Sequence, residues 1–132
     1  MTRLLRDYLF DVRYATHRFV LAWLLYLLIL VLGSVPHARA DIGLLAPGLV
    51  LHALAYGGLT CLLASGLRTG PWRNSVQAVL LIAIMGAGDE CVQSFFPYRH
   101  AAVSDWVVDC LAGFVAATMM VYWYPWAAPR RR

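Results

Sequence analysis

The sequence predicts an all-α membrane protein, an antiparallel bundle of four transmembrane helices preceded by a short amphipathic helix. One observation is composition: the 132 residues are 61% hydrophobic and 14% charged, with mean hydropathy +0.65, whereas soluble domains are about 45–50% apolar and 25% charged. The others are four apolar runs, each near the length that crosses a bilayer, and arginines clustered outside them. So short a chain cannot bury this much apolar surface in a water-soluble core, which excludes a soluble enzyme, a nucleic-acid module and a disordered linker.

The first 18 residues are expected to form an amphipathic arm at the membrane surface. Leu5, Leu9 and Val12 can share one helical face, and most charged residues of the arm fall elsewhere. This pattern is typical of an interfacial anchor on anionic lipid. A helix that binds a partner protein is the alternative.

The four apolar runs predict transmembrane helices joined by short connections that contain Gly, Pro, Asn or Asp. Short connections make consecutive helices antiparallel neighbours. The predicted spans cover residues 19–35, 49–67, 76–96 and 106–123, within a transmembrane domain over residues 19–124. The first run has a second interpretation, because Ala38-Arg39-Ala40 resembles a signal-peptide cleavage site. The polar stretch that begins at Pro36 favours a retained span.

The arginines predict how the chain is oriented. The arm, the connection after the second span and the basic tail at 125–132 carry nine of the 11 arginines, and only Arg39 and Arg99 lie on the other side. The positive-inside rule then places both termini in the cytoplasm and the loops at 36–48 and 97–105 outside. Aromatic residues at 122–126 suit the inner interface. We therefore expect a multi-pass protein of the bacterial cytoplasmic membrane, with lipids and not nucleic acid as partners.

Polar residues gather near the outer ends of the last three predicted spans. Residues four apart share a helical face, and a rise of about 1.5 Å per residue places all of them at one level in the outer third of the membrane. Ionisable groups inside a membrane are costly and indicate a functional or pairing role. The predicted binding residues are His52 and Tyr56, Asp89, Glu90 and Gln93, Arg99 and Ser104, and Asp105 and Asp109.

Several interpretations of this cluster compete. The residues can be structural, with Arg99 paired to a carboxylate and Ser104 or Asp105 capping the last helix. They can bind an anionic headgroup through Arg99 or carry protons or ions across the membrane. They can also hold a divalent cation, with ligands Asp89, Glu90, Asp105 and Asp109. No nucleophile adjoins a convincing base, so the sequence predicts no catalytic residues and favours a protein that is not an enzyme.

Two motifs in this region resemble the VanZ-like family of small bacterial membrane proteins. The stretch from Asp89-Glu90 through Gln93 to Pro97-Tyr98-Arg99 resembles the family signature, and Ser104-Asp105 and Gly113 continue it. The segment from His52 to Tyr56 resembles the family's His-x-x-x-Tyr element. The resemblance covers residues 19–124. Two departures are Gly48-Leu49, where the family often has Asp-Lys, and Asp109, where it usually has Asn.

The resemblance implies a multi-span fold and a link to the cell envelope. The founding member is associated with resistance to the glycopeptide teicoplanin, so a role in glycopeptide tolerance is an expectation here. The leading hypothesis is an outward-facing pocket for a lipid-linked precursor or a lipopeptide headgroup, held directly or through a cation. The alternatives are a metal-using enzyme on a lipid-linked substrate, a proton or ion path in a homo-oligomer, and a structural accessory subunit.

Overall fold

The prediction of an all-α fold is confirmed for the part of the chain that the computed structural model describes, residues 3–36, 47–99 and 101–127. Four of its helices are long and apolar enough to cross a membrane. The elements are α1 (Arg3–Phe10), the 3-10 turn η1 (Val12–Tyr14), α2 (Ala15–Ser34), α4 (Gly48–Gly66), α5 (Pro71–Ser94) and α6 (Val103–Ala127). The cleavage-site resemblance at 38–40 and the arginines at 130–132 lie outside the described residues.

Three long helices begin at least three residues earlier than the apolar runs indicate. Helix α5 begins at Pro71 instead of residue 76, because proline has the fixed φ of a first helical residue and lacks only an N–H that would be unpaired there. Asn74 strengthens this start, since its Nδ2 donates to the Leu67 carbonyl at 2.7 Å and its Oδ1 accepts from Thr69 N at 2.9 Å. Helix α6 begins at Val103 and α2 at Ala15. Hydropathy alone places the end of a helix at the first polar residues, whereas the helical backbone extends through those residues.

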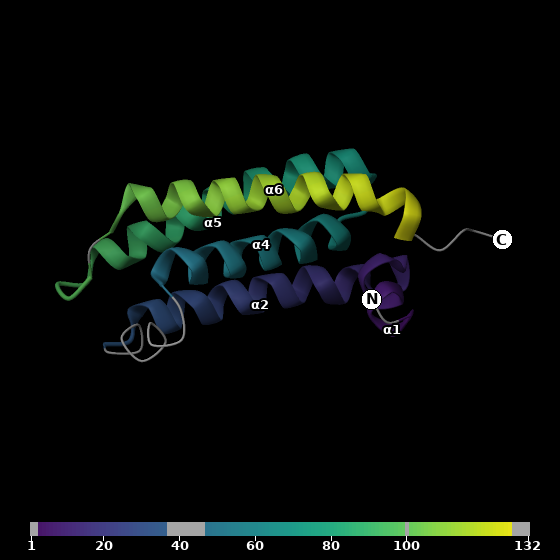
Figure 1. Cartoon of the computed structure of the whole chain (residues 1–132). Coiled ribbons are helices and arrows are strands. Elements are labelled where there is room, and N and C mark those ends of the chain that lie inside the picture. The colour runs from purple at the N-terminus through teal and green to yellow at the C-terminus, as the bar shows by residue number, and fades with distance from the viewer. Residues whose placement is uncertain (1–2, 37–46, 100, 128–132) are drawn as a thin grey trace.

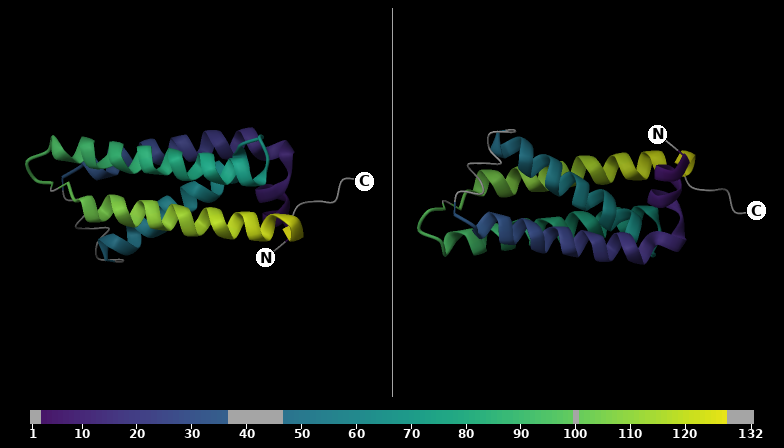
Figure 2. Two further views of the ribbon diagram at one scale, coloured as in Figure 1. Left: turned by 90° about the horizontal axis from the view of Figure 1, so that it is seen from above. Right: turned by 90° about the horizontal axis from the view of Figure 1, so that it is seen from below.

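The four long helices lie side by side (Figure 1). Helix α4 packs against the other three long helices, α6 also contacts α5, and α2 contacts α4 and α5. Figure 2 shows α1 and η1 at the end of the molecule where α2 begins and α4 ends. Consequently the first turns of α4 and α6 and the last turns of α5 share the opposite end, where the predicted polar residues belong.

Small residues allow close helix contacts. A Cβ on Gly66 of α4 would lie 2.8 Å from the backbone nitrogen of Phe19 on α2, and one on Gly113 of α6 would lie 3.0 Å from Ile82 Cγ2 on α5. Such approaches increase dispersion contacts, which hold helices together where lipid replaces water. Both glycines therefore fix helix spacing.

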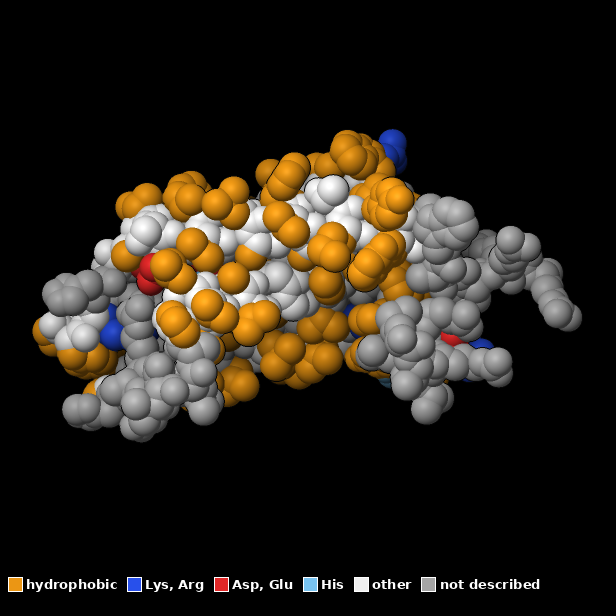
Figure 3. Space-filling model, in the orientation of Figure 1, with side chains coloured by type: hydrophobic (Ala, Val, Ile, Leu, Met, Phe, Trp, Pro, Cys, Tyr) orange, Lys and Arg blue, Asp and Glu red, His pale blue; other side chains and the backbone are white. Residues whose placement is uncertain are grey.

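Large apolar side chains cover the outside of the helices. Leu54, Ile84 and Phe114 are 69%, 70% and 61% exposed, and Figure 3 shows hydrophobic side chains over much of the described part of one face. Monomeric soluble proteins rarely expose large contiguous apolar patches. An apolar exterior around buried polar groups is what a bilayer environment requires.

Arg18 ties the N-terminal arm to the long helices. It is only 1% exposed, its Nε donates to the Ser65 carbonyl at 3.1 Å, and its Nη1 donates to the carbonyls of Asp11, at 3.0 Å, and Tyr8. The last carbonyls of a helix lack partners within the helix, so the guanidinium caps α4 while it holds the turn between α1 and α2.

Candidate functional site

The predicted polar residues come together at the end of the molecule formed by the connection between α5 and α6. Helix α4 supplies His52 and Tyr56 from its first three turns, α5 supplies three residues from its last two turns, and α6 supplies two from its first two turns. Asp89, Gln93 and Asp109 are at most 2% exposed. The groups that most prefer water are thus inside the protein, in two adjacent sets, with Tyr56 and Asp89 in one and His52 and Asp109 in the other.

The first set is centred on Asp89. The Tyr56 hydroxyl donates to Asp89 Oδ2 at 3.1 Å, while the buried Asp89 Oδ1 has no hydrogen-bond partner among the described residues. The nearby Tyr26 hydroxyl on α2 instead donates to the Met85 carbonyl at 2.9 Å. A buried carboxylate oxygen without a donor costs free energy, so Asp89 retains an unused capacity to accept a hydrogen bond.

Gln93 and Arg99 place donor groups around the same point, beside Gly33, as Asp89 Oδ1. Arg99 Nη2 donates to Gln93 Oε1 at 3.0 Å. A Cβ built on Gly33 of α2 would lie 3.6 Å from Asp89 Oδ1 and 3.7 Å from both Arg99 Nη2 and Gln93 Nε2. An acceptor and two donors therefore surround a point that is open because residue 33 has no side chain. The Tyr98 hydroxyl, which donates to the Ser34 carbonyl at 2.6 Å, fastens the α5–α6 connection to the end of α2.

A cavity of about 240 Å³ opens at this point. Ile29, Leu32 and Leu51 form an apolar wall from α2 and α4, and Asp89, Gln93 and Arg99 form the polar wall. Drug-sized ligands occupy cavities of about 300–1,000 Å³. The cavity therefore suits one polar group with the beginning of an apolar chain, not a whole large ligand.

The second set is centred on His52. Its Nδ1 lies 3.0 Å from Asp109 Oδ1, and its Nε2 lies 3.8 Å from Asp105 Oδ2. The His52 ring stacks on Tyr56 with ring centroids 6.0 Å apart. The spacing of four residues accounts for both pairs, because Tyr56 follows His52 by one helical turn and Asp109 follows Asp105 in the same way.

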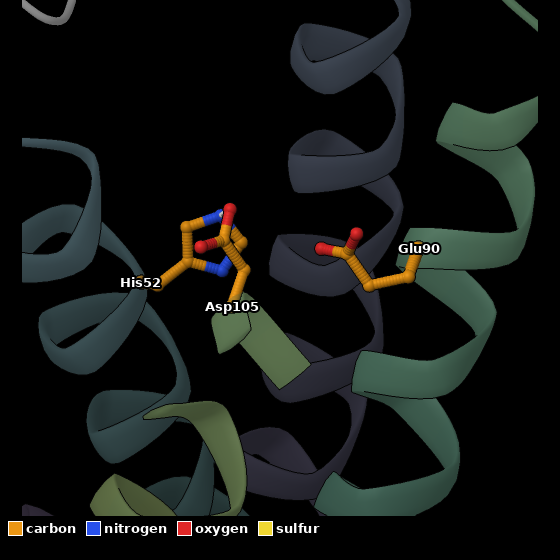
Figure 4. A group of neighbouring side chains, drawn as sticks. All are labelled: His52, Glu90 and Asp105. Atoms are coloured by element: carbon orange, nitrogen blue, oxygen red, sulfur yellow. Dashed lines mark ion pairs between the residues drawn. The ribbon is translucent and has the colours of Figure 1, made fainter. Parts of the chain in front are cut away.

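Glu90 completes this set from α5. Its Oε2 accepts from the Ala102 backbone nitrogen at 2.6 Å, whereas its buried Oε1 has no hydrogen-bond partner among the described residues. One ligand atom from each of His52, Glu90 and Asp105 lies within 4.8 Å of the others, and Figure 4 shows the three side chains directed toward a common space from three helices.

The residues in this group differ from the metal ligands predicted from the sequence. Glu90 and Asp105 belong to both sets, whereas His52, predicted as a binding residue but not among the four metal ligands, replaces Asp89 and Asp109 in the structural group. Because the sequence shows which residues share a level but not how far apart two helices lie, it could not separate the four carboxylates.

Ser104 contributes less than the sequence analysis expected. Its side chain is exposed, and its Oγ donates to Asp105 Oδ1 at a long 3.4 Å. Because α6 begins at Val103, Ser104 and Asp105 lie inside its first turn and do not precede it, as an N-cap must. The expectation that Ser104 or Asp105 caps this helix is therefore wrong. The helix begins with a hydrogen bond from the Asp105 backbone nitrogen to the Ala102 carbonyl, at 2.9 Å.

Three residues at the site were not predicted. Gly33, Ser34 and Tyr98 contribute the open point and the contact between the α5–α6 connection and α2. The available signals were the small Gly33-Ser34 pair at the end of an apolar run and the place of Tyr98 within the stretch from Asp89 to Arg99. No protein-family model matches the chain, and neither a curated protein nor a solved structure matches it.

Proposed function

We propose that this chain is a VanZ-like protein of the bacterial cytoplasmic membrane, with an antiparallel bundle of four transmembrane helices. The positive-inside rule supports both termini in the cytoplasm and the Asp89 cavity near the outer surface. The arm lies at the inner interface, where Arg18 joins it to α2 and α4. The motif from Asp89 to Arg99 supports the family assignment and, with it, a role in envelope biology that includes glycopeptide tolerance.

The cavity binds the headgroup of an amphiphilic envelope ligand, such as a lipid-linked precursor or a lipopeptide. The observation that carries this proposal is the buried Asp89 Oδ1, which has no hydrogen-bond partner in the described ranges and lies beside the donors of Gln93 and Arg99. A hydroxyl or amide group of the headgroup donates to Asp89 and accepts from Arg99 or Gln93. The apolar wall leads the attached chain toward the lipid, which supports an amphiphile over a water-soluble solute.

Gly33→Ala tests the proposal without removing any polar group. The added methyl group would meet its neighbours at ordinary contact distances of 3.6–3.7 Å, so the protein should fold, but the methyl would occupy the point where the headgroup binds. Native mass spectrometry of gently purified wild type should detect a bound lipid or lipopeptide. We expect Gly33→Ala and Asp89→Asn each to reduce its occupancy at least fivefold.

Gly58→Ala is the matched control, because no atom of the described residues lies within 4 Å of a Cβ at that position. It should purify with the same ligand occupancy as the wild type. Equal occupancy in all four proteins would overturn the proposal and favour a structural role for the buried acids.

A further inference from the structure

We propose that His52, Glu90 and Asp105 form a binding site for one divalent transition-metal ion of the Zn²⁺ or Mn²⁺ class. The three residues come from α4, α5 and α6, and one ligand atom of each lies within 4.8 Å of the others. Tetrahedral ligands about 2.1 Å from a metal ion lie about 3.4 Å apart. Side-chain rotations that move each ligand atom by about 1 Å therefore suffice to bring all three atoms within bonding distance of one metal ion.

The unpartnered oxygen of Glu90 points to a ligand at this place. Glu90 is 9% exposed. Its Oε2 accepts from the Ala102 backbone nitrogen, whereas its Oε1 has no donor within the described part of the chain. Its carboxylate is directed toward His52 and Asp105 (Figure 4). A buried carboxylate oxygen that faces a second carboxylate is repelled by it, and a cation between them removes this repulsion and satisfies the oxygen.

Asp109 prepares His52 to act as a ligand. A carboxylate only accepts hydrogen bonds, so Asp109 Oδ1, 3.0 Å from Nδ1, fixes the ring proton on that nitrogen. The lone pair of the imidazole is then on Nε2, on the side of Asp105 Oδ2, 3.8 Å away. A carboxylate that orients a histidine in this way is typical of protein metal sites.

The ligand types select the ion. The imidazole nitrogen favours Zn²⁺, and the two carboxylates also suit Mn²⁺, whereas Ca²⁺ and Mg²⁺ prefer oxygen ligands alone. Two carboxylates balance the charge of one divalent ion, which matters where unpaired charge is costly. Three protein ligands leave at least one coordination position open, as in catalytic zinc sites.

This proposal does not rest on the proposed lipid binding. Glu90 and Asp105 do not line the cavity beside Asp89, and His52 alone contributes to both places. Loss of metal with retained lipid, or the reverse, therefore separates the two proposals.

The test is a titration of tag-free, chelator-treated protein with Co²⁺, followed by visible absorbance, and with Zn²⁺, followed by calorimetry. Wild type should bind one ion per chain. Glu90→Gln keeps an acceptor for the Ala102 nitrogen but loses the carboxylate charge, so we expect at least tenfold weaker binding, and the same for Asp105→Asn. Asp109→Asn should weaken binding about 10–100-fold through the orientation of His52.

Asp11→Asn is the matched control, because Asp11 is a carboxylate that caps η1 at the end of the molecule opposite to His52, Glu90 and Asp105. Its metal affinity should equal that of wild type. Absence of stoichiometric binding by wild type, or equal affinity in wild type and Glu90→Gln, would overturn the proposal. Should the carboxylate variants not fold, electron paramagnetic resonance of Cu²⁺-loaded wild type and His52→Gln decides. A nitrogen coupling that is lost in His52→Gln supports ligation by His52, and an unchanged coupling refutes it.

Discussion

At the residue scale, two buried polar side chains have opposite consequences. Arg18 directs its donors to the backbone carbonyls of Ser65, Asp11 and Tyr8 and thereby joins three segments. Asp89 instead keeps one oxygen without a hydrogen-bond partner among the described residues. Burial of a polar group without a hydrogen-bond partner costs free energy. The satisfied Arg18 network therefore stabilises the fold, whereas the Asp89 oxygen is tolerated where a ligand supplies the missing donor.

Replacement of Arg18 by Met should destabilise the protein by about 1–3 kcal/mol, the usual cost of leaving buried hydrogen-bonding groups without partners. Methionine retains the apolar stem and leaves the three carbonyls without their donor. Thermal unfolding in detergent, followed by circular dichroism, measures the change.

Arg68→Met is the control for that experiment. Arg68 Nη2 donates to Thr16 Oγ1 at 2.8 Å, but this contact is exposed, and surface interactions of charged side chains contribute about 0–1 kcal/mol. An equal loss of stability in both variants would contradict the role assigned to Arg18.

At the element scale, the spacing of helices depends on where glycine lies on the contact face. Helix α4 contains two informative glycines. A Cβ on Gly58 would meet no atom of the described residues within 4 Å, whereas the missing Cβ of Gly66 makes room for the α2 backbone at Phe19 and Ala15. Both are glycines in the same helix, so the comparison separates the contact from the intrinsic effect of glycine in a helix.

We expect Gly66→Ala to destabilise the protein by about 1–3 kcal/mol, as overpacking does in well-packed interiors. The new methyl group would lie 2.8 Å from a backbone nitrogen and 3.1 Å from the Ala15 carbonyl oxygen, neither of which belongs to a flexible side chain. Gly58→Ala should unfold at the wild-type temperature or slightly above it. Unfolding curves that coincide for Gly66→Ala and wild type would show that α2 and α4 can separate without cost.

Sequence reasoning predicts the elements of this protein better than the contacts between them. The apolar runs predict the four long helices, and the spacing of four residues predicts that Asp105 and Asp109 act on one side, where both meet His52. Which carboxylates approach each other, and that Gly33 opens a cavity, depend on distances between helices. A single sequence contains no measure of those distances, so Asp89 and Glu90 are neighbours in the chain that nevertheless belong to two different sets.

At the scale of the whole molecule, the two ends differ in chemistry. One end carries the Arg18 network and the exposed Arg68, and the other carries the buried acids and Arg99. A ligand from the envelope can reach the acids only if their end faces outward, so orientation is the property on which the proposed function depends most directly.

Site-directed labelling in a background without Cys61, Cys91 and Cys110 tests this orientation. Ala101 and Thr69 are exposed and lie in the connections at opposite ends. Because arginines flank Thr69 and the positive-inside rule holds such loops in the cytoplasm, a membrane-impermeant maleimide should label Ala101→Cys in intact cells and Thr69→Cys only after permeabilisation. Labelling with the opposite preference would place the Asp89 cavity on the cytoplasmic side. That outcome would refute binding of an extracellular envelope ligand and leave the metal site of His52, Glu90 and Asp105 untouched, since its geometry is the same in either orientation.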